Sequence, residues 1–150
     1  MRKALGLRLR QHLERLVKQV SNARPAAVFL PAVGEVVDAV ALDNGGAYAS
    51  VTSAEGLRTY LVQQNAAPLL IGPGLVLDAS RGGTVVLLKR SAEAAKLADA
   101  AIYRVDLRDG GVSEPSSVGK LYEGQLSGDG SELLFIAGDS RIGIRDTGSA

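Results

Sequence analysis

Apolar residues near the start of the chain recur with helical spacing. Five of them follow one another at intervals of four, four, three and four residues: Leu5, Leu9, Leu13, Leu16 and Val20. These intervals place the five side chains along one face of a helix, and charged residues occupy the other sides. The pattern predicts a basic amphipathic helix over residues 1–24, ended by Pro25, because the residue before a proline avoids the helical region.

The apolar stripe of this helix has two possible partners. It can pack on its own domain, or it can form a short seam between copies of the chain, since the last intervals also fit a two-heptad a/d pattern. We predict an oligomer contact through four residues of the stripe, Leu9, Leu13, Leu16 and Val20.

After Pro31 the residues become typical of β-strands, and Leu57-Arg-Thr-Tyr-Leu-Val62 alternates apolar and polar positions as a half-buried strand should. We predict a small β-barrel over residues 25–90. Strands are predicted at 33–42, 47–52, 57–62, 75–78 and 84–89, with a loop at 63–70. Asn44-Gly45 predicts a tight hairpin with a type I′ turn between the first two strands. Short strands with glycine at each corner predict a small OB-like or SH3-like β-barrel.

The remaining residues, 91–150, predict a short helix followed by a β-hairpin extension. Ser91–Ala101 is rich in alanine and begins with a good N-cap residue, so we expect the helix there. Strands are predicted at 102–107, 120–126, 132–136 and 141–145, and such strands could pair with the sheet edge of a neighbour. The fold class is therefore mainly β: a small barrel between an N-terminal helix and a C-terminal β extension.

The amino-acid composition limits the kinds of functional site that this chain can form. The chain has no cysteine and one histidine, His12, so disulfides, zinc fingers, iron–sulfur clusters and thiol nucleophiles are excluded. Asp146-Thr147-Gly148-Ser149 matches the string around a pepsin-like catalytic aspartate, but too little chain follows to support such a loop. We therefore expect no enzymatic activity, no cofactor and no metal site. Uninterrupted apolar stretches are also too short for a membrane span.

Charge divides the chain into two unequal parts. Residues 1–24 carry seven basic residues and one acidic residue, a net charge of +6, whereas the remainder carries ten basic and fifteen acidic residues, a net charge of −5. A basic segment on an acidic body is suited to nucleic acid, to an anionic membrane or to the acidic body of another copy.

An alternative function follows from this charge. OB-type barrels bind single strands through a basic groove and stacking aromatic rings. In this chain the cations would come from the predicted helix and the rings from the barrel: Arg8, Arg10, Arg15, Lys18, Tyr48 and Tyr60. Such a protein would be cytoplasmic.

Four segments of the chain resemble the small structural proteins of bacteriophage tails and baseplates. They are Gly34-Glu-Val-Val-Asp-Ala-Val40, Tyr48-Ala-Ser-Val51, Pro68-Leu-Leu-Ile-Gly-Pro-Gly-Leu-Val76 and Gly83-Thr-Val-Val-Leu-Leu88. The resemblance implies an OB-like barrel preceded by a basic helix. It also implies a non-enzymatic subunit of a phage tail, baseplate or capsid. We therefore expect the chain in the virion, as a homo-oligomer in contact with other virion proteins.

Overall fold

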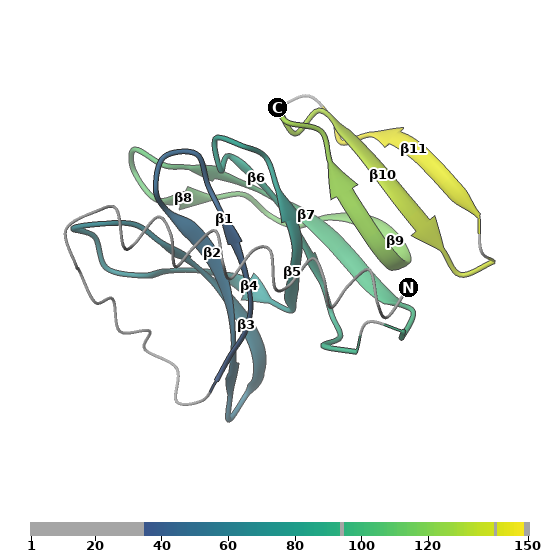
Figure 1. Cartoon of the computed structure of the whole chain (residues 1–150), viewed down its shortest axis with the longest axis horizontal. Helices are drawn as coiled ribbons and strands as arrows, with labels where there is room; N and C mark the ends of the chain where they lie inside the picture. Colours follow the sequence, from purple (N-terminus) through teal and green to yellow (C-terminus); the bar gives the residue numbers. More distant parts are fainter. Residues whose placement is uncertain (1–34, 94, 140, 149–150) are drawn as a thin grey trace.

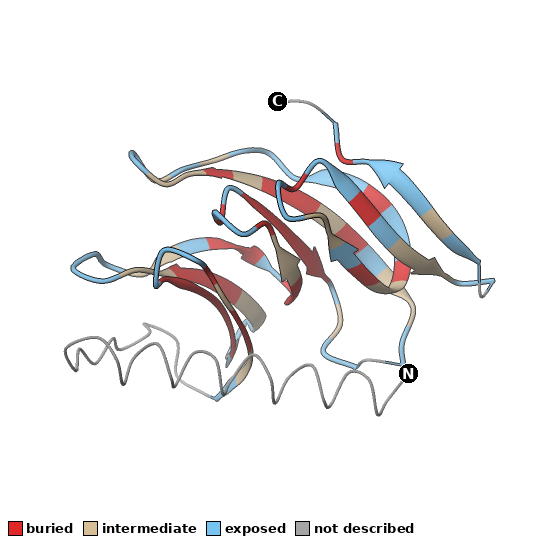
Figure 2. Ribbon diagram, turned by 45° about the horizontal axis from the view of Figure 1, so that its top comes forward, coloured by how far each residue is buried: buried red, intermediate tan, exposed pale blue. Residues whose placement is uncertain are grey.

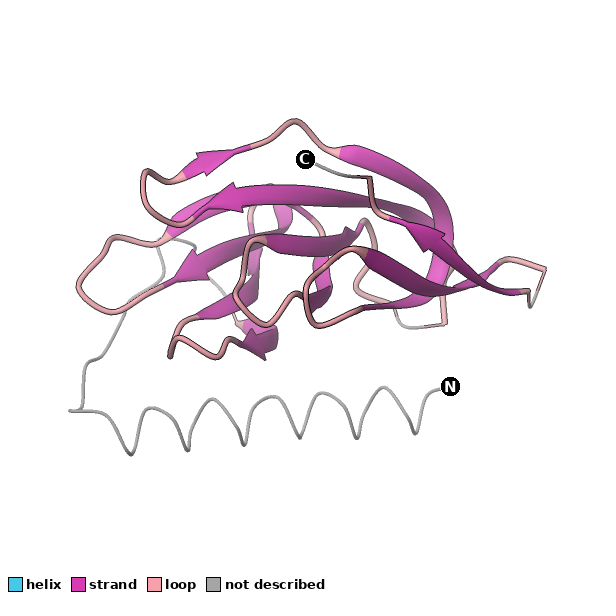
Figure 3. Cartoon of the chain, turned by 90° about the horizontal axis from the view of Figure 1, so that it is seen from above, coloured by secondary structure: helices cyan, strands magenta, loops and turns pink. Residues whose placement is uncertain are grey.

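The structure is a computed structural model, and it describes residues 35–93, 95–139 and 141–148. The described residues form strands, turns and loops, with no helix among them, so the mainly β prediction is confirmed (Figure 3). Eleven strands follow one another along this part of the chain (Figure 1): β1 (Val36–Ala41), β2 (Ala47–Ser53), β3 (Gly56–Val62), β4 (Leu69–Pro73), β5 (Leu75–Ala79), β6 (Val85–Lys89), β7 (Ala98–Asp106), β8 (Gly111–Val112), β9 (Ser116–Leu126), β10 (Glu132–Ala137) and β11 (Ile142–Asp146).

Strands β1 to β4 form a four-stranded antiparallel sheet in chain order. The predicted hairpin between β1 and β2 is confirmed, but its turn is not of type I′. That turn requires positive φ at both central residues, whereas Gly45 has a φ of +87° and Asn44 is not among the residues with positive φ. The loop closes through the amide of Leu42, which donates to the carbonyl of Gly46 at 2.8 Å.

The chain passes from this sheet to the next at Gly74. Its φ is +117°, and a Cβ there would lie 2.6 Å from the carbonyl oxygen of Lys89, so the corner requires glycine. Strand β4 ends at the preceding residue, Pro73. The sequence predicts a loop at 63–70, but Leu69 and Leu70 belong to β4. Pro73 is typical of a loop rather than a strand, and it is tolerated in β4 because β4 is the edge of its sheet.

The second sheet has seven strands in the order β11-β10-β9-β7-β6-β5, with β8 paired to β7. This sheet curls until β9 approaches β5, which lies three positions away in the strand order. The amide of Leu126 donates to Oδ2 of Asp78 at 2.7 Å, and the amide of Arg81 donates to the carbonyl of Gly128 at 2.9 Å. The curled sheet gives the molecule a barrel-like character.

Two hydrophobic clusters lie among the described strands, and β6 contributes to both. Val86 and Leu88 of β6 belong to the cluster shared with the four-stranded sheet. Val85 and Leu87 of the same strand belong to the cluster inside the curled sheet. All five residues of β6 are buried, and Figure 2 shows the buried colour concentrated on these inner strands.

The predicted helix at Ser91–Ala101 is wrong. Residues 98–101 belong to β7, and none of the described residues from 91 to 97 is helical. The Nζ atom of the buried Lys89 accounts for part of this difference, because it donates to the carbonyls of Glu93 at 3.1 Å and Lys96 at 2.9 Å. The loop therefore wraps around an ammonium group, and alanine's helix propensity is overridden by tertiary contacts.

Strands on both sides of residue 90 share one sheet. Val85 pairs with Arg104 and Lys89 pairs with Ala100, so β6 and β7 are direct neighbours. Hydrogen-bonded pairing thus crosses the boundary that the sequence placed between a 25–90 barrel and a 91–150 extension.

Candidate functional site

The outer face of the β10–β11 hairpin is the most exposed apolar surface among the described residues. Ile142 and Ile144 on β11 are 69% and 70% exposed, and Leu134 on β10 is 42% exposed. Leu134 lies directly opposite Ile144, and the half-buried Ile136 lies opposite Ile142. Because cross-strand partners share a face of the sheet, these four side chains form one contiguous patch, called here the hairpin patch.

The opposite face of the hairpin holds it against the body. Leu133 is fully buried in the inner cluster, and Phe135 packs against the same cluster. Gly143 lies beneath the Phe135 ring, where a Cβ would come within 2.5 Å of the ring carbon Cζ. The hairpin therefore packs through one face, which leaves the hairpin patch on the outside.

Strand β11 is also the last strand of its sheet. Its pairing partner is β10, and the strand order ends with it, so its outer edge has no neighbouring strand in the part of the chain described. An edge of this kind presents backbone donors and acceptors that another strand can pair with. The hairpin patch and the free edge lie on the same element (Figure 1).

The end of β11 is anchored by Thr147. Its Oγ1 donates to the carbonyl of Gly130 at 2.7 Å, and its amide donates to the carbonyl of Ser131 at 3.0 Å. The guanidinium of Arg104 on β7 donates to the carbonyl of Thr147 at 3.2 Å and also bonds the carbonyl of Gly148. These bonds fix the position of the edge strand relative to the body.

The turn between β9 and β10 is organised by Asp129. Its Oδ1 accepts hydrogen bonds from the amide of Ser131 at 3.0 Å and from the hydroxyls of Ser131 and Ser127 at 2.7 and 2.9 Å. These donors, the Ser131 amide foremost, lower the pKa of Asp129 to about 2. The turn at the base of the hairpin patch is thus built around an ionised carboxylate.

Two shallow depressions of about 240 Å³ each flank the hairpin patch. One is lined by Leu126, Leu134 and Ile144 among others, and the second by Ile144, Arg145 and Asp146 together with residues of β10. Side chains of a partner could enter these depressions, because the apolar surface is not flat there.

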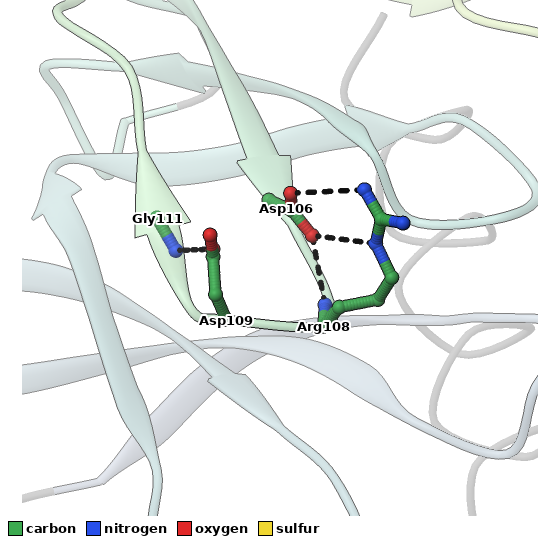
Figure 4. A network of polar contacts seen from close by, with 4 residues as sticks. All are labelled: Asp106, Arg108, Asp109 and Gly111. Atoms are coloured by element: carbon green, nitrogen blue, oxygen red, sulfur yellow. Dashed lines mark hydrogen bonds and ion pairs between the residues drawn. The ribbon is translucent and has the colours of Figure 1, made fainter.

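A larger open pocket of about 670 Å³ lies at the β7–β8 hairpin. Both of its aspartates accept hydrogen bonds from neighbouring residues of the loop (Figure 4): the carboxylate of Asp106 accepts from the Arg108 amide at 2.9 Å and from its guanidinium, and Asp109 accepts from the Gly111 amide at 2.7 Å. The Arg108 amide, the largest influence, lowers the pKa of Asp106. We interpret this network as stabilising the loop.

The two predicted stacking rings are both buried, and Tyr48 belongs to a core cluster. Tyr48 is fully buried, and its hydroxyl donates to the carbonyl of Gly83. Tyr60 is 7% exposed. The Tyr48 ring therefore has no face open to a base in this structure, and stacking by either ring stays a prediction. Burial also raises the pKa of the Tyr48 phenol well above its ordinary value.

The other predicted contact residues lie outside the described residues. They are the oligomer-contact set Leu9, Leu13, Leu16 and Val20, and the cationic set Arg8, Arg10, Arg15 and Lys18. Their roles stay predictions. Within residues 35–93, 95–139 and 141–148, no three His, Asp or Glu side chains are grouped so that they could hold a metal ion. The same ranges contain no helix of the length and apolar character needed to cross a bilayer.

Comparisons of the chain with protein-family models, with curated proteins and with solved structures give no match.

Proposed function

We propose that this chain is a non-enzymatic structural subunit that assembles with copies of itself through the hairpin patch and the edge of β11. The observation that carries the proposal is the pair of isoleucines on β11, each more than two-thirds exposed on a strand with a free edge. Contiguous exposed apolar surface of this kind is typical of interaction sites, whereas isolated exposed apolar residues are common.

A second copy is the occupant that fits this edge. If two β11 strands pair antiparallel about a two-fold axis, each supplies the backbone groups that the other lacks. Because side chains alternate with a period of two, directly opposite residues fall on the same face, and Ile142 and Ile144 of both copies would then form one apolar surface. A closed dimer of this type can serve as a building unit for larger rings.

The particle in which this subunit would function is a phage virion, in the tail, the baseplate or a capsid-associated layer. This part of the proposal is supported by the resemblance of residues 34–88 to small tail and baseplate proteins and by the β-rich, barrel-like body. Other virion proteins would then be its additional partners.

The assembly is tested by light scattering after size exclusion. The full chain is expected to form a discrete oligomer, and Ile142→Asp with Ile144→Asp is expected to reduce its mass, because four buried carboxylates in a dimer would be strongly unfavourable. Leu70→Asp, which changes an exposed apolar residue of the other sheet, is the matched control and should leave the mass unchanged. Monomeric wild-type chain at all concentrations, or an unchanged mass in the double variant, would overturn the interface.

Two further measurements address the particle and the alternative. In purified phage particles, mass spectrometry is expected to detect the chain in fixed proportion to other virion proteins. Finding it only in the soluble cell fraction would contradict a virion role. Binding to a single-stranded oligonucleotide with a steep salt dependence would instead favour the nucleic-acid alternative. The logarithm of the affinity would then fall by about 0.7 for each neutralised phosphate per log unit of salt concentration.

A further inference from the structure

The outer face of the four-stranded sheet is apolar from one strand to the next. Tyr48 belongs to the core cluster, and Oγ of Ser50 accepts from the Val76 amide of β5 at 2.8 Å, so these residues of β2 point inward. Alternation then places Ala47, Ala49 and Val51 on the opposite, outer face.

The strand register extends this face across the sheet. Ala39 of β1 lies opposite Ala49, which in turn lies opposite Tyr60 of β3. In the next row Ala41 lies opposite Ala47, which lies opposite Val62. We call these seven residues the alanine face: Ala39, Ala41, Ala47, Ala49, Val51, Tyr60 and Val62. Its four alanines lie on β1 and β2, and the larger Tyr60 and Val62 lie on β3.

Five of the seven residues of the alanine face are buried, although the described strands do not account for what covers them. Ala39 is 0% exposed, Val51 1% and Tyr60 7%, yet neither core cluster includes them. The strand that packs against this sheet is β5, and it lies on the other face: Oγ1 of Thr59 donates to the carbonyl of Gly74 at 2.9 Å, beside the Ser50 bond. Figure 2 shows the buried colour on both β2 and β3.

We propose that the occupant of the alanine face is the N-terminal segment of the same chain, seated through its apolar stripe. The stripe is the set predicted from the sequence: Leu5, Leu9, Leu13, Leu16 and Val20. Leucines on a flat layer of alanines allow close packing, because large side chains on one element fill the space left by small ones on the other.

Chain length is consistent with an occupant from the same copy. Strand β1 begins at Val36 and is an edge of this sheet, so the segment enters next to the alanine face. A helix over residues 5–20 would be about 24 Å long at 1.5 Å per residue. Strands of six or seven residues span about 20–24 Å, so one helix matches the sheet. Residues 21–34 can extend about 46 Å, which is ample for the chain to reverse direction.

The predicted helix then turns Arg15 and Lys18 away from the sheet. At 100° per residue, Lys18 lies about 180° and Arg15 about 120° from the centre of the leucine stripe, whereas Arg8 lies on its flank. This assignment gives the leucines an intrachain partner in place of the contact between copies that the sequence predicted. It does not depend on the hairpin patch.

Engineered disulfides test the proposal, since the chain has no cysteine of its own. In the full chain, Ala49→Cys is combined in turn with Leu9→Cys, Leu13→Cys or Leu16→Cys, and oxidation is expected to form a disulfide within one chain for at least one pair. The matched controls combine Ala49→Cys with Arg15→Cys or Lys18→Cys and should form it at least tenfold more slowly. Mixtures of isotopically heavy and light chain distinguish bonds within a chain from bonds between chains.

Equal rates in both series, or a bond that joins two chains, would overturn the proposal. The second measurement needs a single cysteine, Ala49→Cys, whose thiol is expected to resist maleimide in the full chain. Adding Leu13→Asp and Leu16→Asp should increase its labelling rate at least tenfold, whereas Arg15→Asp and Lys18→Asp should not. Fast labelling without those changes would contradict a cover on this face. The Ile142→Asp and Ile144→Asp variant should keep the disulfide, so the two proposals fail independently.

Discussion

Lys89 is a charged residue that the fold has enclosed completely. Its ammonium group has three donors, and the carbonyls of Glu93, Lys96 and Tyr122 accept from it at 3.1, 2.9 and 3.0 Å. Burial lowers its pKa, while the Glu123 carboxylate acts in the opposite direction. A buried charge is tolerated only when its donors are satisfied, and here the acceptors come from a loop and from β9.

We expect Lys89→Met to destabilise the protein by about 2–4 kcal/mol, because it leaves three carbonyls without their donor in the interior. Lys120→Met, which alters an exposed lysine of β9, should change the free energy of unfolding by less than about 0.5 kcal/mol. Urea unfolding at neutral pH measures both. Equal stability of the two variants would show that the three bonds contribute little.

Asp129 makes stability sensitive to acid. Its pKa is lowered from 3.8 in the unfolded chain to about 2 in the folded one, so between these values the unfolded state binds more protons. Its contribution is therefore present above pH 3.8 and is lost as the pH falls through 2. Asp129→Asn should flatten the dependence of the unfolding midpoint on pH between 4 and 2. If the variant keeps the steep wild-type dependence of the unfolding midpoint on pH, that dependence comes from other titratable groups.

At the level of elements, the β10–β11 hairpin depends on one contact between a glycine and a ring. A methyl group at residue 143 would lie 2.5 Å from Cζ of Phe135, so the ring must move for Gly143→Ala to fold. We expect a loss of about 1–2 kcal/mol in thermal or urea unfolding. Gly82→Ala is the control, because nothing lies within 4 Å of a Cβ there and its φ is not positive. Equal effects of the two changes would contradict this account.

Several elements were predictable from local pattern. The strands at 57–62, 84–89, 132–136 and 141–145 appear within one residue of their predicted bounds, because alternation and glycine turns are properties of short segments. Strand β9 begins at Ser116, four residues before the strand predicted at 120–126. The first half of β7 was not predictable in this way. Ala98–Ala101 favours a helix on its own, and only its neighbours β6 and β9 make it a strand.

The candidate site was only partly visible in the sequence. Ile142, Gly143 and Ile144 alternate as a strand should, and strand addition by the C-terminal strands was an expectation. That the isoleucines face outward depends on Phe135 and Leu133 filling the inner side, which requires the packing of the whole sheet. Conversely, Tyr48 and Tyr60 carry no local signal that distinguishes a core ring from an exposed one.

On the scale of the whole molecule, the division into two sheets depends on one corner. Gly74 allows β4 and β5 to belong to different sheets within a few residues, and the reason is its close approach to the Lys89 carbonyl. No pattern of apolar and polar residues predicts such a close approach between two backbone segments, because the two segments are distant in sequence. The sequence therefore predicted the strands better than it predicted which strands are neighbours.

The burial of β6 on both faces has a consequence for how the protein opens. Its backbone amides lie between two hydrophobic clusters, so neither cluster can separate from β6 without disturbing the other. We expect hydrogen–deuterium exchange at Val86 and Leu87 to proceed only through global unfolding, with the same free energy as urea denaturation gives. Exchange of these amides with a free energy below that of global unfolding would contradict this expectation. The two sheets should accordingly melt as a single cooperative unit.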